Sequence, residues 1–324
     1  MIFRILEDQY GQKIKAAREQ ARAADHRFMQ LALSLGRRGL GRTWPNPAVG
    51  AVVVKDGVIV HETYYEGDEA TRRPVFSITK GFGATLVGIA QKRGLLDVKE
   101  KVSDWLPVHH PHIKEGATIE HVLAMTAGGS PEANTYRYTS GPILNSLPNI
   151  LWLATGKSPA RSFDEDLAAP LGLTLDWPRN EKGWMQIGNR GPLPVLQATH
   201  RDLARLGLLW LRKGKWRQEQ LLDESFVDAA LEPPFPEANT AYGYLWWLNK
   251  GGGTWRDPKS PPTARDGKRI PGAPENVYTA QGARGKLIMV IPDHDMVAVT
   301  LGETNDEHQP TLDLWDAIAP ALPV

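Results

Sequence analysis

The sequence predicts an α+β fold in which an antiparallel sheet is flanked by helices and carries an inserted, mostly helical lobe. Two observations support this prediction. Strand-like apolar runs occur near both ends of the chain, whereas helical patterns dominate the stretch between them. The dipeptide Asp56-Gly57 separates two of the apolar runs, and Asp-Gly in that context is the strongest short-range signal of a hairpin. The sheet is therefore expected to be assembled from both ends of the chain.

This order divides the chain into three segments of a single unit. We expect an N-terminal helical segment at 1–46 that covers the sheet, a sheet lobe made of 47–75 and 235–324, and a helical lobe at 76–234. A chain of 324 residues can bury about three quarters of the surface that it exposes when unfolded. The predicted fold can therefore build a large core.

The composition argues against several classes of partner and site. The formal net charge is +1 with both signs evenly scattered, so the sequence predicts no nucleic-acid partner and no membrane partner. The absence of cysteine rules out disulfides, thiolate nucleophiles and Cys-ligated zinc. The N-terminus is too charged for a signal peptide and no apolar run is long enough to span a bilayer, so we expect a cytoplasmic protein. The sequence leaves the oligomeric state open.

The first elements along the chain are a helix and a hairpin. Residues 14–40 are rich in Ala, Arg, Glu and Gln and predict a helix that weakens at Gly36 and Gly39. The apolar runs at 49–54 and 58–64 predict the two strands of the hairpin.

The middle of the chain predicts helices and its last third predicts strands. Helices are expected at 78–93, 118–126, 143–155, 201–212 and 311–319. Strands are expected at 242–247, 286–291 and 296–301, with a turn at 292–295 between the last two. A loop at 251–274 is rich in Gly, Pro and charged residues and is long enough to be functional or mobile.

Ser77 and Lys80 are the first candidate site residues, at an abrupt change from strand to helix. Three residues apart on a helix, their side chains share one face. A serine hydroxyl is a poor nucleophile until a neighbour takes its proton, and the unpaired N–H groups of a helix start favour negative charge. Ser77 is therefore a candidate nucleophile and Lys80 its proton acceptor. The structural alternative is a serine N-cap followed by a solvated lysine.

Tyr138 is the second candidate, 61 residues after Ser77. A phenolate that a nearby cationic lysine stabilises can act as a base, and a neighbouring hydroxyl can fix its orientation. The alternative is a tyrosine that packs at a loop corner.

A third candidate is the run TAQGARGK at 279–286, immediately before an apolar strand. Acyl transfer needs backbone donors aimed at the developing oxyanion, and a glycine lets a strand edge approach the substrate closely. An ordinary glycine-containing turn explains the same sequence equally well.

Two other features favour structural explanations. The tract His109-His110-Pro111-His112 is dense in metal ligands, but it has no acidic partner at helical spacing, so it favours an exposed loop over a metal site. We accordingly expect no metal and no cofactor. The tryptophans at 184, 246, 247 and 255 belong either to a pocket wall or to the core. The sequence contains no Gly-x-Ser-x-Gly, no phosphate loop and no His-Glu-x-x-His, which removes the commonest competing hydrolase motifs.

In this order the motifs resemble the serine β-lactamase-like family, especially its branch of class C β-lactamases, esterases and 6-aminohexanoate-dimer hydrolases. The resemblance runs from about residue 49 to the C-terminus. It rests on VFSITK at 75–80, TIEHVLAMTAG at 118–128, YTS at 138–140, YGYLWW at 242–247 and GARG at 282–285.

The resemblance implies a role for each candidate. Ser77 is expected to be the acylated nucleophile, Lys80 and Tyr138 to shuttle its proton, and the N–H groups of Ser77 and Ala283 to form the oxyanion hole. Substrate contacts are expected from Gly282, Ser140 and Arg284.

Two positions depart from the pattern of that family. Ser140 stands where the family commonly has Asn. Ala280-Gln281-Gly282 stands where the β-lactamases carry Lys-Thr-Gly, which removes the cation that meets the carboxylate of a β-lactam.

A second, shorter resemblance covers residues 25–60. DHRFM at 25–29 and RGLGRTWPNPAVGAVVV at 38–54 look like the start of the riboflavin-pathway zinc deaminases. The His-x-Glu and Pro-Cys-x-x-Cys that bind zinc in that family do not follow. We interpret the stretch as a helix and hairpin that now serve the hydrolase sheet.

The sequence therefore predicts a serine hydrolase that forms an acyl-enzyme on a small ester or amide. Two alternatives remain open. One is a non-catalytic, ligand-binding relative with the same fold, and the other is a residual nucleoside deaminase.

Overall fold

The computed structural model describes residues 50–65, 67–106, 110–128, 135–139, 141–259, 261–306 and 308–322. The predicted N-terminal segment at 1–46 falls outside these ranges, as does most of the deaminase-like stretch.

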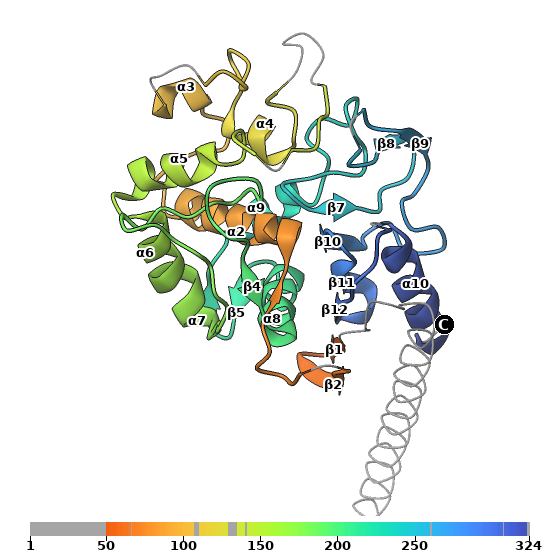
Figure 1. Ribbon diagram of the computed structural model, residues 1–324. Coiled ribbons are helices and arrows are strands. Elements are labelled where there is room, and N and C mark those ends of the chain that lie inside the picture. The colour runs from red at the N-terminus through yellow and green to blue at the C-terminus, as the bar shows by residue number, and fades with distance from the viewer. Residues whose placement is uncertain are drawn as a thin grey trace, which may run out of the picture.

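Six antiparallel strands form the main sheet, in the order β2-β1-β12-β11-β10-β7. Their bounds are β1 Ala51–Lys55, β2 Val58–Thr63, β7 Trp247–Leu248, β10 Tyr278–Gly282, β11 Lys286–Ile291 and β12 Met296–Leu301. The predicted hairpin is β1 and β2, and its turn has φ values of 53° at Asp56 and 78° at Gly57, a conformation that Asp and Gly tolerate. β1 pairs with β12, so the two ends of the described chain meet in one sheet (Figure 1).

Two helices cover the opposite faces of this sheet. α8 (His200–Leu211) lies on the face toward the helical lobe, and α10 (Gln309–Ile318) lies on the outer face (Figure 1). The side chains of β11 alternate accordingly: Ile288 joins the core on the α8 side, whereas Leu287 and Met289 join the core on the α10 side. Because successive side chains of a strand point to opposite faces, a continuous apolar strand requires such double cover.

The helical lobe lies between β3 and β7 in the chain. Its helices are α2 Thr79–Lys92, α3 Val102–Trp105, α4 Ile119–Leu123, α5 Ser146–Thr155, α6 Pro159–Phe163, a π-helical turn at Asp164–Ala168, α7 Ala169–Leu171 and α9 Glu224–Ala230. Three short strand pairs complete the structure: β3 Arg73–Pro74 with β4 Gln197–Ala198, β5 Lys215–Trp216 with β6 Glu219–Gln220, and β8 Thr254–Arg256 with β9 Ala264–Asp266. Short 3₁₀ turns are found at Phe76–Ile78, Pro292–His294 and Ala319–Ala321.

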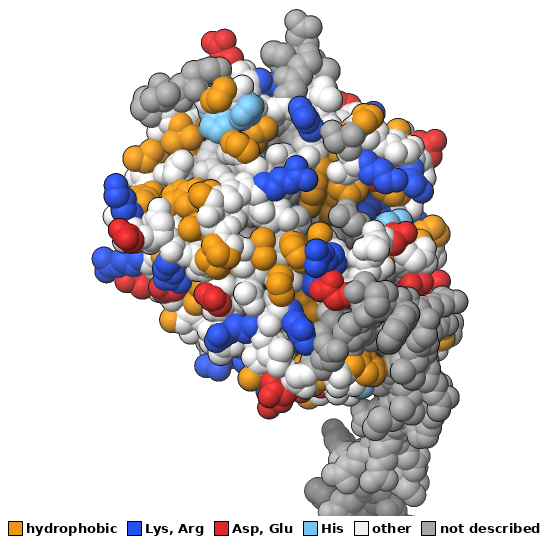
Figure 2. Space-filling view, viewed as in Figure 1, with side chains coloured by type: hydrophobic (Ala, Val, Ile, Leu, Met, Phe, Trp, Pro, Cys, Tyr) orange, Lys and Arg blue, Asp and Glu red, His pale blue; other side chains and the backbone are white. Residues whose placement is uncertain are grey.

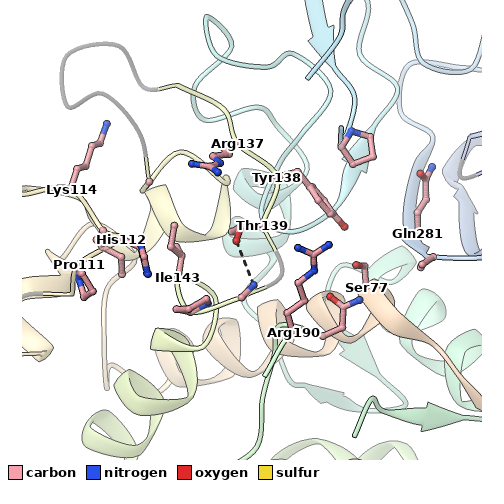
Figure 3. Close-up of a pocket in the computed structure, with 18 of the residues that line it drawn as sticks. Ser77, Pro111, His112, Lys114, Arg137, Tyr138, Thr139, Ile143, Arg190 and Gln281 are labelled. Carbon is pink, nitrogen blue, oxygen red and sulfur yellow. Dashed lines mark hydrogen bonds between the residues drawn. The ribbon is translucent and has the colours of Figure 1, made fainter. Parts of the chain in front are cut away.

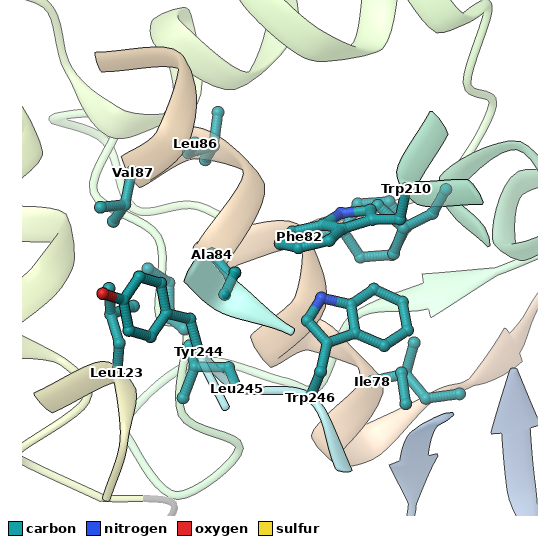
Figure 4. Packing of buried hydrophobic residues seen from close by; sticks show 14 of the residues in the cluster. Ile78, Phe82, Ala84, Leu86, Val87, Leu123, Trp210, Tyr244, Leu245 and Trp246 are labelled. Carbon is teal, nitrogen blue, oxygen red and sulfur yellow. The ribbon is translucent and has the colours of Figure 1, made fainter. Parts of the chain in front are cut away.

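α2 runs through the centre of the molecule. Every residue from Thr79 to Ala90 is buried, and aromatic side chains such as Trp210 and Trp246 surround the helix (Figure 4). Close packing explains its glycines: a Cβ added to Gly88 would lie 2.5 Å from a ring carbon of Phe226. The helix therefore holds its first turn on a rigid, desolvated support.

The structure confirms the α+β class and corrects several of the predicted elements. The run 242–247 was expected to be a strand, but only its end joins β7, because Leu245 adopts a φ of 63° that breaks the extended backbone. The predicted loop at 251–274 contains the β8–β9 hairpin. Residues 279–282 of the run 279–286, for which a strand edge or a glycine-containing turn was expected, belong to strand β10. The boundaries of the three predicted segments stay a prediction.

Among the described residues, no helix combines the length and the apolar character needed to cross a bilayer.

Candidate active site

Ser77 lies in the 3₁₀ turn that leads directly into α2. Phe76, the residue before it, has a φ of 47°, a left-handed conformation that costs a bulky residue on the order of 1 kcal/mol or more. The side-chain hydroxyl of Thr79 donates to the carbonyl oxygen of Phe76 at 2.6 Å and supports this turn. The strained turn places Ser77, which is half-buried, on the wall of a cavity.

Lys80 is 1% exposed and points back toward Ser77. Its Nζ donates a hydrogen bond to Ser77 Oγ at 2.7 Å. The same Nζ lies 4.8 Å from the centroid of the Tyr138 ring. The alternative of a solvated lysine is therefore wrong, because Lys80 is enclosed between the serine and the tyrosine.

Tyr138 comes from a segment that forms no helix or strand, and its side chain points toward Ser77 (Figure 3). Its ring stacks on that of Trp247 with centroids 5.6 Å apart and planes at 20°, and it meets Tyr242 edge-on at 6.1 Å. This aromatic contact holds a residue that no regular element supports. Ser140, predicted to contact substrate from the same segment, lies outside the described residues.

The end of β10 forms the wall beside Ser77. A Cβ added to Gly282 would lie 2.1 Å from the carbonyl oxygen of Val75, so only glycine lets the strand come this close to the start of α2. Ala283, the next residue, is half-buried and lines the same cavity as Ser77. The two backbone segments that were predicted to supply the oxyanion donors are thus brought together.

The cavity has a volume of about 900 Å³. Besides Ser77, Tyr138 and the end of β10, its lining includes Trp247, Gln281, Pro258, Gly128, Ile143, Asn189, His112 and Pro111. The charged residues of the lining are Lys114, Arg137, Arg190 and Glu115, so cations predominate. In the upper half of the face in Figure 2, Lys and Arg side chains lie near the middle as well as at the left and right edges.

Two cations at the C-terminal end of β10 and the start of β11 do not line this cavity. Lys286 is fully buried, forms an ion pair with Glu303 and donates to the carbonyl oxygen of Gly302 at 2.5 Å. Arg284 lies over the ring of Phe76, with its guanidinium carbon 5.7 Å from the ring centroid, and does not line the cavity. The substrate contact expected of Arg284 stays a prediction.

Arg269 is a residue that the sequence analysis missed. It is 3% exposed and lies behind the cavity wall, with its guanidinium carbon 3.9 Å from the centroid of the Trp247 ring. Its Nη2 donates to Gln281 Oε1 at 3.2 Å, and Gln281 also lines the cavity. No motif or periodicity marks Arg269; the only available signal was the length and charge of the loop at 251–274.

The structure also shows where the histidine tract and two of the tryptophans lie. Within the described part of the chain, no group of three His, Cys, Asp or Glu residues could hold a metal ion; His110 and His112 pack against each other, and His109 lies outside that part. Trp247 lines the cavity, and Trp246 is fully buried in the core.

The sequence matches a known family model, and the structure is similar to solved structures. A family model described as Beta-lactamase matches residues 42–322. A penicillin-binding protein homologue from Caulobacter crescentus has a similar structure, with a TM-score of 0.70, 15% identity and coverage of 91% of this chain and 98% of that one. EstCE1, a hydrolase with promiscuous acyltransferase activity, gives a TM-score of 0.64, 14% identity and coverage of 91% and 99%. At these identities the two structures show a shared fold.

A local similarity links the chain to a different protein. The riboflavin biosynthesis protein RibD of Aquifex aeolicus is 45% identical over 69 residues, which are 20% of this chain and 19% of that protein. So small a share does not assign a second family.

Proposed function

The chain belongs to the β-lactamase family, and on that premise we propose that it is a serine hydrolase that forms an acyl-enzyme on a small ester or amide. One observation carries the proposal: Lys80 Nζ lies 2.7 Å from Ser77 Oγ at the wall of a cavity. A nucleophile and a proton acceptor within hydrogen-bond reach are the signature of covalent catalysis. The description of EstCE1 as a hydrolase supports the same reaction class.

In the proposed reaction, Ser77 Oγ attacks the carbonyl carbon of the substrate. Lys80 and Tyr138 take the hydroxyl proton and return it to the leaving group as the bond to that group breaks. The backbone N–H groups of Ser77 and Ala283 stabilise the negative charge on the carbonyl oxygen. Water then attacks the acyl carbon, its proton returns to Ser77 through the same pair, and the acid product leaves.

A fluorophosphonate probe tests the proposal without knowledge of the substrate. Such a probe reacts only with an activated serine, so we expect stoichiometric labelling, and peptide mapping should locate the label at Ser77. A chain that binds small molecules but is never labelled would be the non-catalytic relative instead.

The residues on the strand beside Ser77 also predict which substrates are preferred. We expect p-nitrophenyl acetate to be hydrolysed at least about tenfold faster than a chromogenic cephalosporin. In the family, a cation on the strand beside the oxyanion pairs with the carboxylate of a β-lactam, and a contact of that kind is worth roughly 1.5 to 3 kcal/mol. Ala280 cannot supply it, Lys286 is paired with Glu303, and an uncharged ester never needs it.

Side-by-side rates for the two substrates, measured with one enzyme preparation, check this expectation. Comparable or faster cephalosporin cleavage would contradict it. That result would mean that a cation elsewhere in the lining, such as Arg137 or Arg190, meets the carboxylate.

A further inference from the structure

We propose that Arg269 is a positioning residue that favours the deprotonated phenol of Tyr138 and so helps to activate Ser77. The inference rests on the proposed function, because it assigns Arg269 a role in the same proton transfer. Arg269 reaches neither the nucleophile nor the cavity, and acts through its charge and through Trp247.

The environment of Arg269 is unusual for a buried cation. Within the described part of the chain no carboxylate forms an ion pair with it, and its buried Nε has no hydrogen-bond partner. A buried charge without a counter-ion is costly unless other groups compensate it. Here the compensation is aromatic: the guanidinium carbon lies 3.9 Å from the ring centroid of Trp247 and 5.2 Å from that of Trp255.

Trp247 connects this charge to the candidate base. The centroid of the Trp247 ring lies 5.6 Å from that of the Tyr138 ring, and the guanidinium of Arg269 lies over the same Trp247 ring. Burial lowers the pKa of Arg269 to about 10, and the negative charge of a Tyr138 phenolate opposes that shift. Electrostatic coupling is reciprocal, so the guanidinium favours the phenolate form of Tyr138.

Three described neighbours of Tyr138 or Arg269 are titratable but uncharged near pH 7. Burial raises the pKa of Tyr136 and of Tyr242 well above the usual range, so both phenols stay neutral. Burial lowers the pKa of His308 to about 4, so this neighbour of Arg269 is uncharged near pH 7.

Among the described residues, three charged groups lie near Tyr138 or Arg269. Lys80 faces Tyr138 from α2, and Arg190 faces it from the cavity, where solvent screens its charge. Asp257 lies near Arg269, but its Oδ1 accepts backbone N–H groups of Lys259 and Thr263. Lys80 is therefore the buried cation over the Tyr138 ring, and Arg269 is a buried cation over the ring of Trp247 on which Tyr138 stacks.

The experiment measures the rate of fluorophosphonate labelling as a function of pH. Loss of the positive charge in Arg269→Gln is expected to move the midpoint of the rising limb up by about one pH unit and to slow labelling near pH 7 about tenfold. Arg269→Lys keeps the charge and should leave the midpoint within a few tenths of a unit of the wild type. Arg265→Gln is the matched control, because it removes an exposed arginine from the same stretch of chain at 251–274. The guanidinium carbon of Arg265 lies 5.6 Å from the centroid of the Trp255 ring.

A purely structural role gives a different pattern. If Arg269→Gln slows labelling but keeps the wild-type midpoint, or if Arg269→Lys shifts the midpoint as far as Arg269→Gln, Arg269 only packs against Trp247 and the inference is wrong. Should the glutamine variant fail to fold, Arg269→Met, which keeps an apolar stem beside the rings, makes the same comparison. Wild-type protein that is not labelled at all refutes the proposed function itself, so the two failures are distinguishable.

Discussion

Ser77→Ala is expected to abolish ester hydrolysis and probe labelling, with a loss in kcat of about a thousandfold or more. The hydroxyl supplies the atom that forms the covalent bond, and no neighbouring group in the described cavity stands in the same position. The fold should survive, because Ser77 is half-buried and its side chain contributes one hydrogen bond, to Lys80. We expect a cost near 1 kcal/mol, which lowers Tm by a few degrees.

The measurements are the hydrolysis rate of p-nitrophenyl acetate, the extent of fluorophosphonate labelling and a thermal melt by circular dichroism. Ser103→Ala is a suitable control, because Ser103 is exposed on α3 and lies outside the cavity. Full hydrolysis by a folded Ser77→Ala protein would end the serine-hydrolase proposal.

Lys80→Ala and Tyr138→Phe are each expected to lower the acylation rate by about a hundredfold or more, as for loss of a positioned acid or base. Tyr138→Phe is the sharper test, because the variant keeps the ring that stacks on Trp247 and lies under Lys80 Nζ, and loses only the hydroxyl. Lys80→Met complements the alanine variant, since Lys80 is fully buried and truncation leaves a hole beside α2.

Pre-steady-state release of p-nitrophenol measures the acylation step, and Tyr65→Phe, which removes an exposed hydroxyl, is the control. The double variant Lys80→Met with Tyr138→Phe should be little slower than the worse single variant, because groups that share one proton act as a unit. If Tyr138→Phe acylates at the wild-type rate, Tyr138 only packs against Trp247.

The sequence alone determined the features that depend on near neighbours in the chain. Strands β11 and β12 occupy the predicted ranges, and α2 and α8 each begin and end within one residue of the prediction. Apolar periodicity and glycine stops encode these elements locally. The pair Ser77 and Lys80 is also local, since a spacing of three residues fixes it on one helical turn.

The tertiary structure alone decided how distant residues join that pair. The family resemblance had named Tyr138 and Gly282, but only the structure shows how Tyr138 reaches Lys80 from an irregular segment and how Gly282 lets β10 approach Val75. Arg269, which contacts Trp247 from a loop without periodicity, was found from the structure alone. Lys286 forms an ion pair with Glu303 and does not line the cavity, and the sequence around it does not predict this pairing. A residue's own neighbours in the chain do not specify such contacts, because they depend on how sheet, helical lobe and loops pack against one another.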